Sequence, residues 1–151
     1  MRAVIQRVER ADIKIARDKF SEIQVGYVVL LGIESGDTLK DVGYMVRKIH
    51  NLKLFGERFD RSIQDEAGEI LVISQFTLLA DCRKGRRPDW SRAAGAEEAE
   101  PLYQAVLDGL RQENLEVREG SFGAKMRVNL VNDGPVTIIL DSRERGKKVD
   151  N

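Results

Sequence analysis

The sequence predicts a single α/β domain, because strand-like apolar segments are interspersed with two segments of helical periodicity. The 151 residues have the length of about one domain, and a chain of this size can bury a core without disulfides or metals. No repeat, linker or low-complexity tract interrupts the sequence. We therefore expect one domain over residues 1–142, followed by a charged C-terminal tail, residues 143–151, that frays.

The first third of the sequence predicts three strands and then a helix. Residues 3–8 and 13–15 have apolar stretches typical of strands, and residues 25–33 are almost entirely apolar, as in a buried strand. The helix should begin at Thr38, because Asp41 follows three residues later and completes a capping box. Its buried face is predicted from apolar residues at helical spacing: Leu39, Val42, Met45, Val46, Ile49 and Leu52.

The middle of the sequence predicts a strong strand, a loop and a second helix. Residues 51–55 return to extended structure, whereas the polar residues 58–68 carry little pattern. A buried strand is expected over residues 69–79, and the polar and basic residues 81–96 form a loop. An amphipathic helix follows from about Glu97. Its inward residues are expected to be Ala99, Leu102, Tyr103, Val106 and Leu110.

The last third predicts strands again, over residues 115–118, 126–131 and 136–140. Asp133-Gly134-Pro135 stands between the last two strands and is typical of a turn. Only about one X–Pro bond in twenty is cis in folded proteins, so the local sequence favours a trans peptide here.

The charge balance and the lack of long apolar segments limit the classes of partner. Lysine plus arginine equals aspartate plus glutamate at 25 each, so any contact with nucleic acid must come from a local basic patch. No apolar run approaches the roughly 20 residues of a membrane helix, and nothing near Met1 resembles an export signal. The lone Cys82 fits a reducing compartment, and we expect a cytoplasmic protein without a membrane partner.

Common catalytic groups are missing from the sequence. His50 is the only histidine and lies on the first predicted helix, without an obvious nucleophile beside it. Cys82 likewise has no clear partner. No Cys/His cluster has the spacing of a zinc site, and neither a P-loop nor a GxGxxG motif occurs. We therefore expect neither a metal nor a cofactor.

Two polar segments at the ends of predicted strands have both a structural and a functional interpretation. Ser74-Gln75-Phe76-Thr77-Leu78 either satisfies backbone groups at a strand end or forms a rim of hydroxyl, amide and N–H donors facing a pocket. Residues 132–137, with the sequence NDGPVT, are a turn when taken alone.

Together, however, these two segments resemble the paired signature of the D-aminoacyl-tRNA deacylases. Residues 3–8 (AVIQRV), 51–55 (NLKLF), 68–72 (GEILV) and 83–88 (RKGRRP) are similar to that family in the same order. The resemblance covers residues 1–142 and departs from the family only in residues 58–67 and in the charged tail.

The resemblance implies a fold, a reaction and an oligomeric state. The fold is a mostly antiparallel or mixed, barrel-like sheet with two helices. The reaction is hydrolysis of the ester between a D-amino acid, and also glycine, and the 3′ end of tRNA. The resemblance also implies a homodimer in which Gly134-Pro135 of one subunit, joined by a cis peptide, enters the pocket of the other and collides with L-amino acids. Arg7 is similar to the family arginine that braces this motif; alternatively, it is a surface arginine on a strand.

The same resemblance assigns the catalytic segment to Ser74, Gln75, Phe76 and Thr77. The neighbouring 2′-hydroxyl of the terminal adenosine promotes the attack, and backbone N–H groups around Phe76 and Thr77 stabilise the developing oxyanion. Thr77 lacks an obvious base, so we expect it to position the substrate and not to attack it.

Candidate tRNA contacts come from one basic loop and one apolar segment. Arg83, Lys84, Arg86 and Arg87 either clamp phosphates of the acceptor stem or form a solvated loop. Two further side chains either line the terminal adenine or belong to the core; these are Phe122 and Met126. Competing functions are a nucleic-acid-binding protein without catalysis and a general esterase for small D-amino-acid esters.

Overall fold

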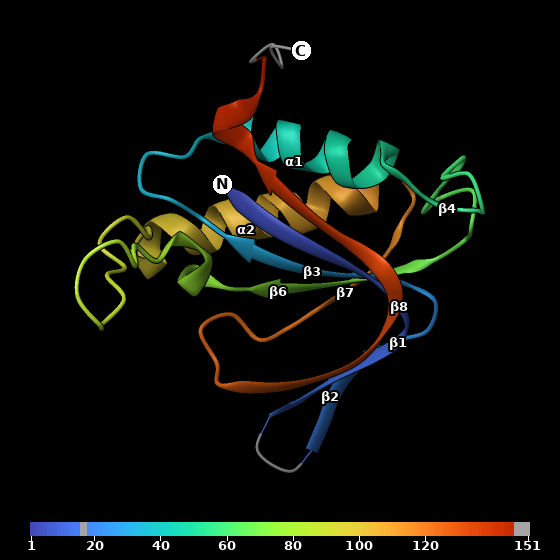
Figure 1. Cartoon of the computed structure of the whole chain (residues 1–151), viewed down its shortest axis with the longest axis horizontal. Helices are drawn as coiled ribbons and strands as arrows, with labels where there is room; N and C mark the ends of the chain where they lie inside the picture. Colours follow the sequence, from blue (N-terminus) through green and yellow to red (C-terminus); the bar gives the residue numbers. More distant parts are fainter. Residues whose placement is uncertain (16–17, 147–151) are drawn as a thin grey trace.

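The computed structural model describes residues 1–15 and 18–146, which form a strongly curved sheet covered on one face by two helices (Figure 1). The strands are β1 (Arg2–Ile15), β2 (Asp18–Ile23), β3 (Gly26–Gly32), β4 (Lys53–Phe55), β5 (Arg61–Ser62), β6 (Glu69–Ser74), β7 (Glu116–Glu119) and β8 (Met126–Asp141). The α-helices are α1 (Leu39–Asn51) and α2 (Ala96–Gln112), and the short 3-10 helices are η1 (Phe76–Leu79) and η2 (Ser142–Glu144). The predicted α/β class with a mixed, barrel-like sheet is confirmed.

The main sheet has the strand order β2-β1-β3-β6-β7, and β8 pairs with β1 outside this path. β1 runs antiparallel to β2, β3 and β8, whereas β6 runs parallel to both β3 and β7. β3 and β6 are therefore the central parallel pair, and they end at the same edge of the sheet.

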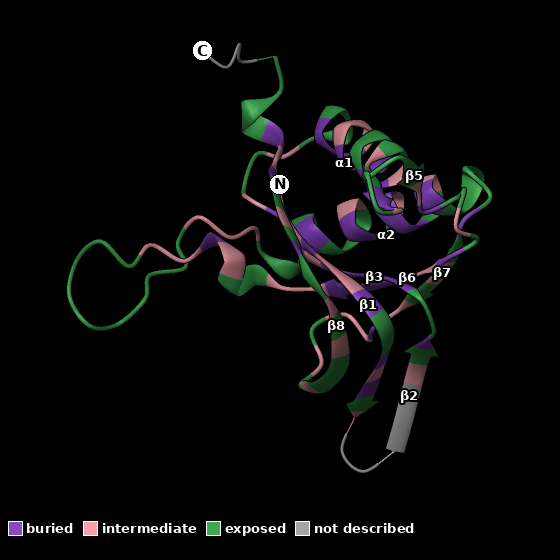
Figure 2. Ribbon diagram, turned by 45° about the vertical axis from the view of Figure 1, so that its right-hand side comes forward, coloured by how far each residue is buried: buried purple, intermediate pink, exposed green. Residues whose placement is uncertain are grey.

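The unbroken apolar runs of β3 and β6 follow from burial on both faces of the sheet (Figure 2). On one face, Val29 and Val72 pack against α1 and α2 within the larger core cluster. On the opposite face, Val28 and Leu71 belong to a second cluster inside the curl of the sheet.

β1 is one continuous strand where the sequence predicted two. Ala3 and Ile5 face the helices, whereas Val8 and Ile13 face the second cluster. The pairing with β8 shifts register on both sides of Val8, and such a bulge exchanges the buried and exposed faces without ending the strand. The exchange of faces breaks the apolar alternation, so the sequence pattern looked like two short strands.

β8 is likewise continuous, and the predicted turn at Asp133-Gly134-Pro135 is wrong. Residues 126–131 pair with residues 10–15 of β1, and residues 137–141 pair with residues 2–6. The register shift between these two halves lets the strand pass through Gly134 and Pro135 without reversing.

The helices agree with the sequence except at their ends. Thr38 and Asp41 form the predicted capping box of α1. Leu39, predicted to be buried, is exposed in the first turn of the helix, at the edge of an open hollow between α1 and α2. In α2, Leu107 joins the predicted buried residues, whereas Leu102 is only half-buried.

The chain after β8 packs on the domain at first, in contrast to the frayed tail expected from Arg143. The Arg143 guanidinium lies 2.9 Å from the Asp141 carboxylate and 3.2 Å from that of Glu34. Arg145 lies 3.2 Å from Asp41, which is buried at the start of α1. Ion pairs therefore hold η2 and Arg145, and the rest of the expected tail, residues 147–151, lies outside the described residues.

Candidate active site

A pocket of about 410 Å³ opens where β3 and β6 end together. Its walls come from these strand ends, from the start of α2 and from residues 122–128, which lead into β8. Ser74, Gln75 and Phe76 line one side, so a segment that the sequence singled out borders this pocket. A second hollow of about 420 Å³ lies between β1, β2 and β8, but it is lined by none of the predicted site residues.

The segment that borders the pocket is a strand end followed by a 3-10 turn. The predicted strand over residues 69–79 stops at Ser74, the last residue of β6. Gln75 still donates its amide to the Leu31 carbonyl (2.8 Å), and the chain then turns into η1. This turn leaves Phe76 57% exposed at the rim of the pocket, where a continued strand would have carried it along the sheet.

The start of η1 presents two backbone amides that are free to bind a ligand. In the described part of the chain, no backbone or side-chain acceptor receives the N–H groups of Phe76 and Thr77. The Thr77 hydroxyl accepts a hydrogen bond from the Gln75 side-chain amide. That amide cannot accept a proton, so this contact orients the hydroxyl without activating it. Thr77 itself is exposed and does not line the pocket.

The C-terminal end of η1 is held by Arg2, which sequence reasoning missed. The Arg2 guanidinium donates to the Leu78 carbonyl (2.9 Å) and to the Asp141 carboxylate (3.0 Å). Burial alone would raise the pKa of Asp141, but hydrogen bonds from Arg143 and Arg2 hold it well below its usual range. Arg2 and Asp141 are sequentially distant and lie outside the polar motifs, so no pattern in the sequence connects them to the site.

Phe122 and Met126 line the same pocket as Ser74 and Gln75. The Phe122 ring lies 5.5 Å from that of Tyr103, and Met126 packs against the second core cluster. Both side chains therefore contact the core with one side and the pocket with the other. This geometry combines the two interpretations left open by the sequence.

Gly134 and Pro135 lie away from the pocket of their own chain. They are exposed on β8, do not line the pocket, and are joined by a cis peptide, as the resemblance implies. The half-buried Arg7 lies beside them: its Nε is 2.8 Å from the Asp133 carboxylate and its guanidinium donates to the Leu54 carbonyl. Arg7 also lies over the Phe55 ring, at 5.7 Å from its centroid. Through Asp133, Arg7 thus contacts the residue directly before Gly134.

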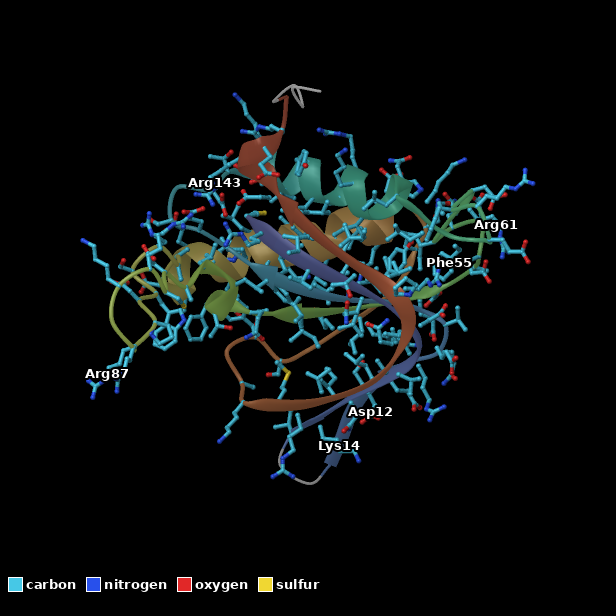
Figure 3. All side chains as sticks on the ribbon, in the orientation of Figure 1. Asp12, Lys14, Phe55, Arg61, Arg87 and Arg143 are labelled. Carbon is cyan, nitrogen blue, oxygen red and sulfur yellow. The ribbon has the colours of Figure 1, made fainter. Side chains whose placement is uncertain are left out.

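The predicted basic loop extends beyond η1 and is closed at its base. Backbone hydrogen bonds of 2.7 and 3.0 Å join Asp81 and Asp89. Arg83 folds back onto Asp81 through several hydrogen bonds, and these hold the pKa of that carboxyl well below its usual range. Lys84, Arg86 and Arg87 are exposed, and Figure 3 shows Arg87 pointing away from the domain. Three of the four predicted cations are therefore available to a ligand, whereas Arg83 is paired.

The residues that the sequence set aside as nucleophiles lie outside the pocket. His50 contacts Gln64 (2.7 Å) and Glu113 (3.2 Å) at the end of α1, and Cys82 is an exposed free thiol. Among residues 1–15 and 18–146, no group of His, Cys, Asp and Glu side chains is arranged to hold a metal ion. The same residues form no helix that is long and apolar enough to cross a membrane.

Comparisons with known proteins agree over nearly the whole chain. A family model described as D-Tyr-tRNA(Tyr) deacylase matches residues 4–141. The chain is 52% identical over 146 residues to the D-aminoacyl-tRNA deacylase of Clostridium beijerinckii, covering 95% of this chain and 98% of the relative. It is 48% identical over 148 residues to that of Dehalococcoides mccartyi, covering 96% of this chain and 97% of the relative.

Two solved structures share the fold. The c-Myc DNA Unwinding Element Binding Protein superimposes with a TM-score of 0.87 at 44% identity, over 93% of this chain and 98% of that one. A probable eukaryotic D-amino acid tRNA deacylase superimposes with a TM-score of 0.76 at 15% identity, over 92% of this chain and 97% of that one, and at this identity the likeness concerns the fold alone.

Proposed function

The chain belongs to the D-Tyr-tRNA(Tyr) deacylase family, and on that premise we propose that it hydrolyses the ester joining a D-amino acid to the 3′ end of tRNA. The observation that carries this proposal is the pocket. It brings the end of β6 and Phe76, the first residue of η1, together with Phe122 and Met126. The aminoacylated end of tRNA has both a reacting carbonyl and an adenine base, and these two sets of residues suit the two parts.

In the proposed reaction, a water molecule adds to the carbonyl carbon and the bond to the ribose oxygen breaks. The products are a free D-amino acid and tRNA, with the proton of the water passing to the departing ribose oxygen. The amides of Phe76 and Thr77 donate to the oxyanion as it forms, and Ser74 and Gln75 orient the aminoacyl group. No base contacts the Thr77 hydroxyl in the described residues, so the neighbouring 2′-hydroxyl of the substrate supplies the assistance.

Selection against L-amino acids is proposed to come from a second copy of the chain. Gly134 and Pro135 do not line their own pocket, so their carbonyls reach an aminoacyl group only in another subunit. In such a homodimer, the side chain of an L-amino acid collides with this rigid wall and that of a D-amino acid points elsewhere. Glycine has no side chain to exclude, so glycyl-tRNA is a substrate too. Arg7 holds the wall in place through Asp133.

The first experiment measures the release of labelled amino acid from D-tyrosyl-, L-tyrosyl- and glycyl-tRNA by the purified protein. We expect rapid loss of the D-tyrosyl and glycyl forms and retention of the L-tyrosyl form. If no amino acid is released from any of the three substrates while tRNA still binds, the deacylase proposal is wrong.

That second outcome would favour a nucleic-acid-binding protein without catalysis. The observation that keeps this candidate open is the 44% identity to a protein named for binding a DNA unwinding element. A catalytic function explains why the pocket and the free amides of η1 accompany the basic loop, whereas binding alone requires only the loop.

A general esterase for small D-amino-acid esters is distinguished by the basic loop. Replacing Arg86 and Arg87 by glutamine removes two exposed cations that we assign to acceptor-stem phosphates. The KM for D-tyrosyl-tRNA should rise, and its dependence on log salt should become shallower by about 0.9 for each lost phosphate contact. Hydrolysis of a small D-tyrosine ester should not change, and equal effects on both substrates would contradict the clamp.

A further inference from the structure

Trp90, the single tryptophan of the chain, is exposed beside the rim of the pocket. Trp90 is 42% exposed, and the centroid of its ring lies 5.9 Å from that of Phe76, at an interplanar angle of 70°. Phe76 is itself 57% exposed and lines the pocket. Large aromatic side chains usually bury most of their surface, so an adjacent pair left open is informative.

The backbone holds Trp90 in a fixed place. Asp89, the preceding residue, is bonded to Asp81 on the opposite side of the loop by two backbone hydrogen bonds. The Trp90 carbonyl accepts from the Ala93 amide (2.9 Å), which closes a turn directly after the ring. The indole is therefore presented by the rigid base of the basic loop, and a ligand that stacks on it need not order the chain first.

Three features follow one another outward from the pocket. Phe76 forms the rim, Trp90 adjoins Phe76, and the exposed cations of the loop, Lys84, Arg86 and Arg87, lie beyond the bridge between Asp81 and Asp89 (Figures 1 and 3). Aromatic faces that stack bases, followed by cations that track phosphates, are the general means by which proteins bind single-stranded nucleic acid.

We propose that Trp90 and Phe76 form a stacking subsite for the nucleotide that precedes the terminal adenosine, which is a cytidine in tRNA. The inference rests on the proposed function, since it assigns the pocket to the aminoacylated adenosine. The Trp90 and Phe76 rings meet edge to face with their centroids 5.9 Å apart, so the exposed indole is the next aromatic surface beyond the pocket rim. One base leaving the pocket therefore reaches Trp90, and its phosphates then face the loop.

The test uses uncharged ligands, so it does not depend on catalysis. Adenosine monophosphate fills only the pocket, whereas the dinucleotide CpA adds the proposed cytidine. We expect CpA to bind about tenfold more tightly, as one stacked base contributes, and to quench the emission of Trp90. Adenosine monophosphate should bind without this change in emission, because Trp90 is the only tryptophan.

Variants separate stacking from a general effect on the fold. Trp90→Leu should bind both ligands equally, measured by calorimetry, and Trp90→Phe should restore most of the preference for CpA. Phe59→Leu is the matched control: Phe59 is also an exposed aromatic residue, at 49%, but it lies in the segment between β4 and β5 at the other end of the domain. Its replacement should leave the preference for CpA unchanged.

The outcomes distinguish this inference from the proposed function. If the protein deacylates D-tyrosyl-tRNA but CpA binds no better than adenosine monophosphate and Trp90 emission is constant, the stacking subsite is wrong and the deacylase function stands. If the emission of Trp90 changes with protein concentration and not with CpA concentration, a second subunit covers the ring. That result also overturns the subsite. If neither ligand binds and no ester is hydrolysed, both proposals fail.

Discussion

The Thr77 hydroxyl follows the pocket-lining residues Ser74, Gln75 and Phe76 along the chain but has no means of activation. Its partner is the Gln75 amide, which donates and cannot accept a proton. Serine and threonine nucleophiles need an adjacent base, and the only histidine lies on α1 with Gln64 and Glu113 as partners. The chemistry of this residue is therefore orientation.

We predict that Thr77→Ala retains substantial turnover. Loss of one hydrogen bond between neutral groups costs about 1 kcal/mol, which corresponds to roughly a fivefold decrease in kcat for D-tyrosyl-tRNA. Single-turnover release of labelled D-tyrosine measures this directly, with binding of uncharged tRNA as the check on integrity. Complete loss of hydrolysis by a variant that folds and binds tRNA normally would identify Thr77 as a nucleophile.

At the scale of secondary-structure elements, η1 is held at its C-terminal end by one distant side chain, Arg2. Its first amides are the proposed oxyanion donors, and the Leu78 carbonyl in its last turn accepts a hydrogen bond from the Arg2 guanidinium. Asp141 binds both Arg2 and Arg143, and so holds the Arg2 guanidinium from the other side. A 3-10 turn of four residues has little stability of its own, so the direction of its amides relies on this support.

We predict that Arg2→Ala lowers kcat about tenfold and leaves the KM for tRNA unchanged, because one charge-assisted hydrogen bond to η1 is lost. Arg143→Ala is the matched control, since it removes the other guanidinium bound to Asp141 but its hydrogen-bond partners Asp141 and Glu34 lie outside η1. Steady-state kinetics and thermal unfolding of both variants make the comparison. Equal losses of kcat, or losses that follow stability alone, would contradict a role of Arg2 in positioning η1.

The contact between α1 and α2 provides a second prediction at the same scale, from two glycines within helices. A Cβ atom at Gly43 would meet only the mobile end of Arg47, at 3.3 Å, whereas one at Gly109 would lie 2.7 Å from the Val46 Cγ2 atom. Both substitutions gain helix propensity, but Val46 is buried and β-branched and cannot move aside easily.

Gly43→Ala should therefore raise the free energy of unfolding by about 0.5–1 kcal/mol, and Gly109→Ala should lower it by about 1 kcal/mol. Urea unfolding followed by circular dichroism measures both variants. Stabilisation of similar size in the two would mean that α2 shifts away from α1 at no cost, contrary to the packing described.

Elements in which one apolar pattern runs from end to end could be predicted from the sequence. Elements in which a bulge or a turn interrupts that pattern could not. The capping box and the spacing from Val42 to Ile49 predicted α1, and burial on both faces explains why β3 was recognised. In β1 and β8, bulges change which side of the strand is buried, so each was predicted as two strands. The 3-10 turn after Ser74 follows from hydrogen bonding with Leu31 on another strand, which local sequence does not report.

The site shows the same limit. Ser74, Gln75 and Phe76 were found as a motif, and the structure places them with Phe122 and Met126 around one pocket. Arg2, Asp141 and Trp90 carried no motif, because their importance comes from contacts between distant parts of the chain.

On the scale of the whole molecule, Gly134 and Pro135, which form the proposed chiral filter, lie away from the pocket of their own chain. Arg7 beside the filter lies over Phe55, and Figure 3 shows Phe55 and the Arg87 loop at opposite ends of the domain. The pocket lies at the loop end, next to η1. A filter that acts on this pocket must therefore come from another copy, and in a twofold dimer each copy supplies its filter to the other.

Mixing two variants tests this arrangement. Ala124→Trp fills the pocket and should hydrolyse none of the substrates, while its Gly134 and Pro135 stay intact. A variant with both Gly134 and Pro135 replaced by alanine should hydrolyse both L-tyrosyl-tRNA and D-tyrosyl-tRNA. The two variants are dissociated and reassociated together, with the first in tenfold excess. L-tyrosyl release should then fall by about tenfold, because most unfilled pockets of the second variant face the intact Gly134-Pro135 of the first. Release from D-tyrosyl-tRNA should persist, which excludes inhibition by the added protein. Unchanged L-tyrosyl release after demonstrated exchange of subunits would place the filter within each chain and overturn the cross-subunit proposal.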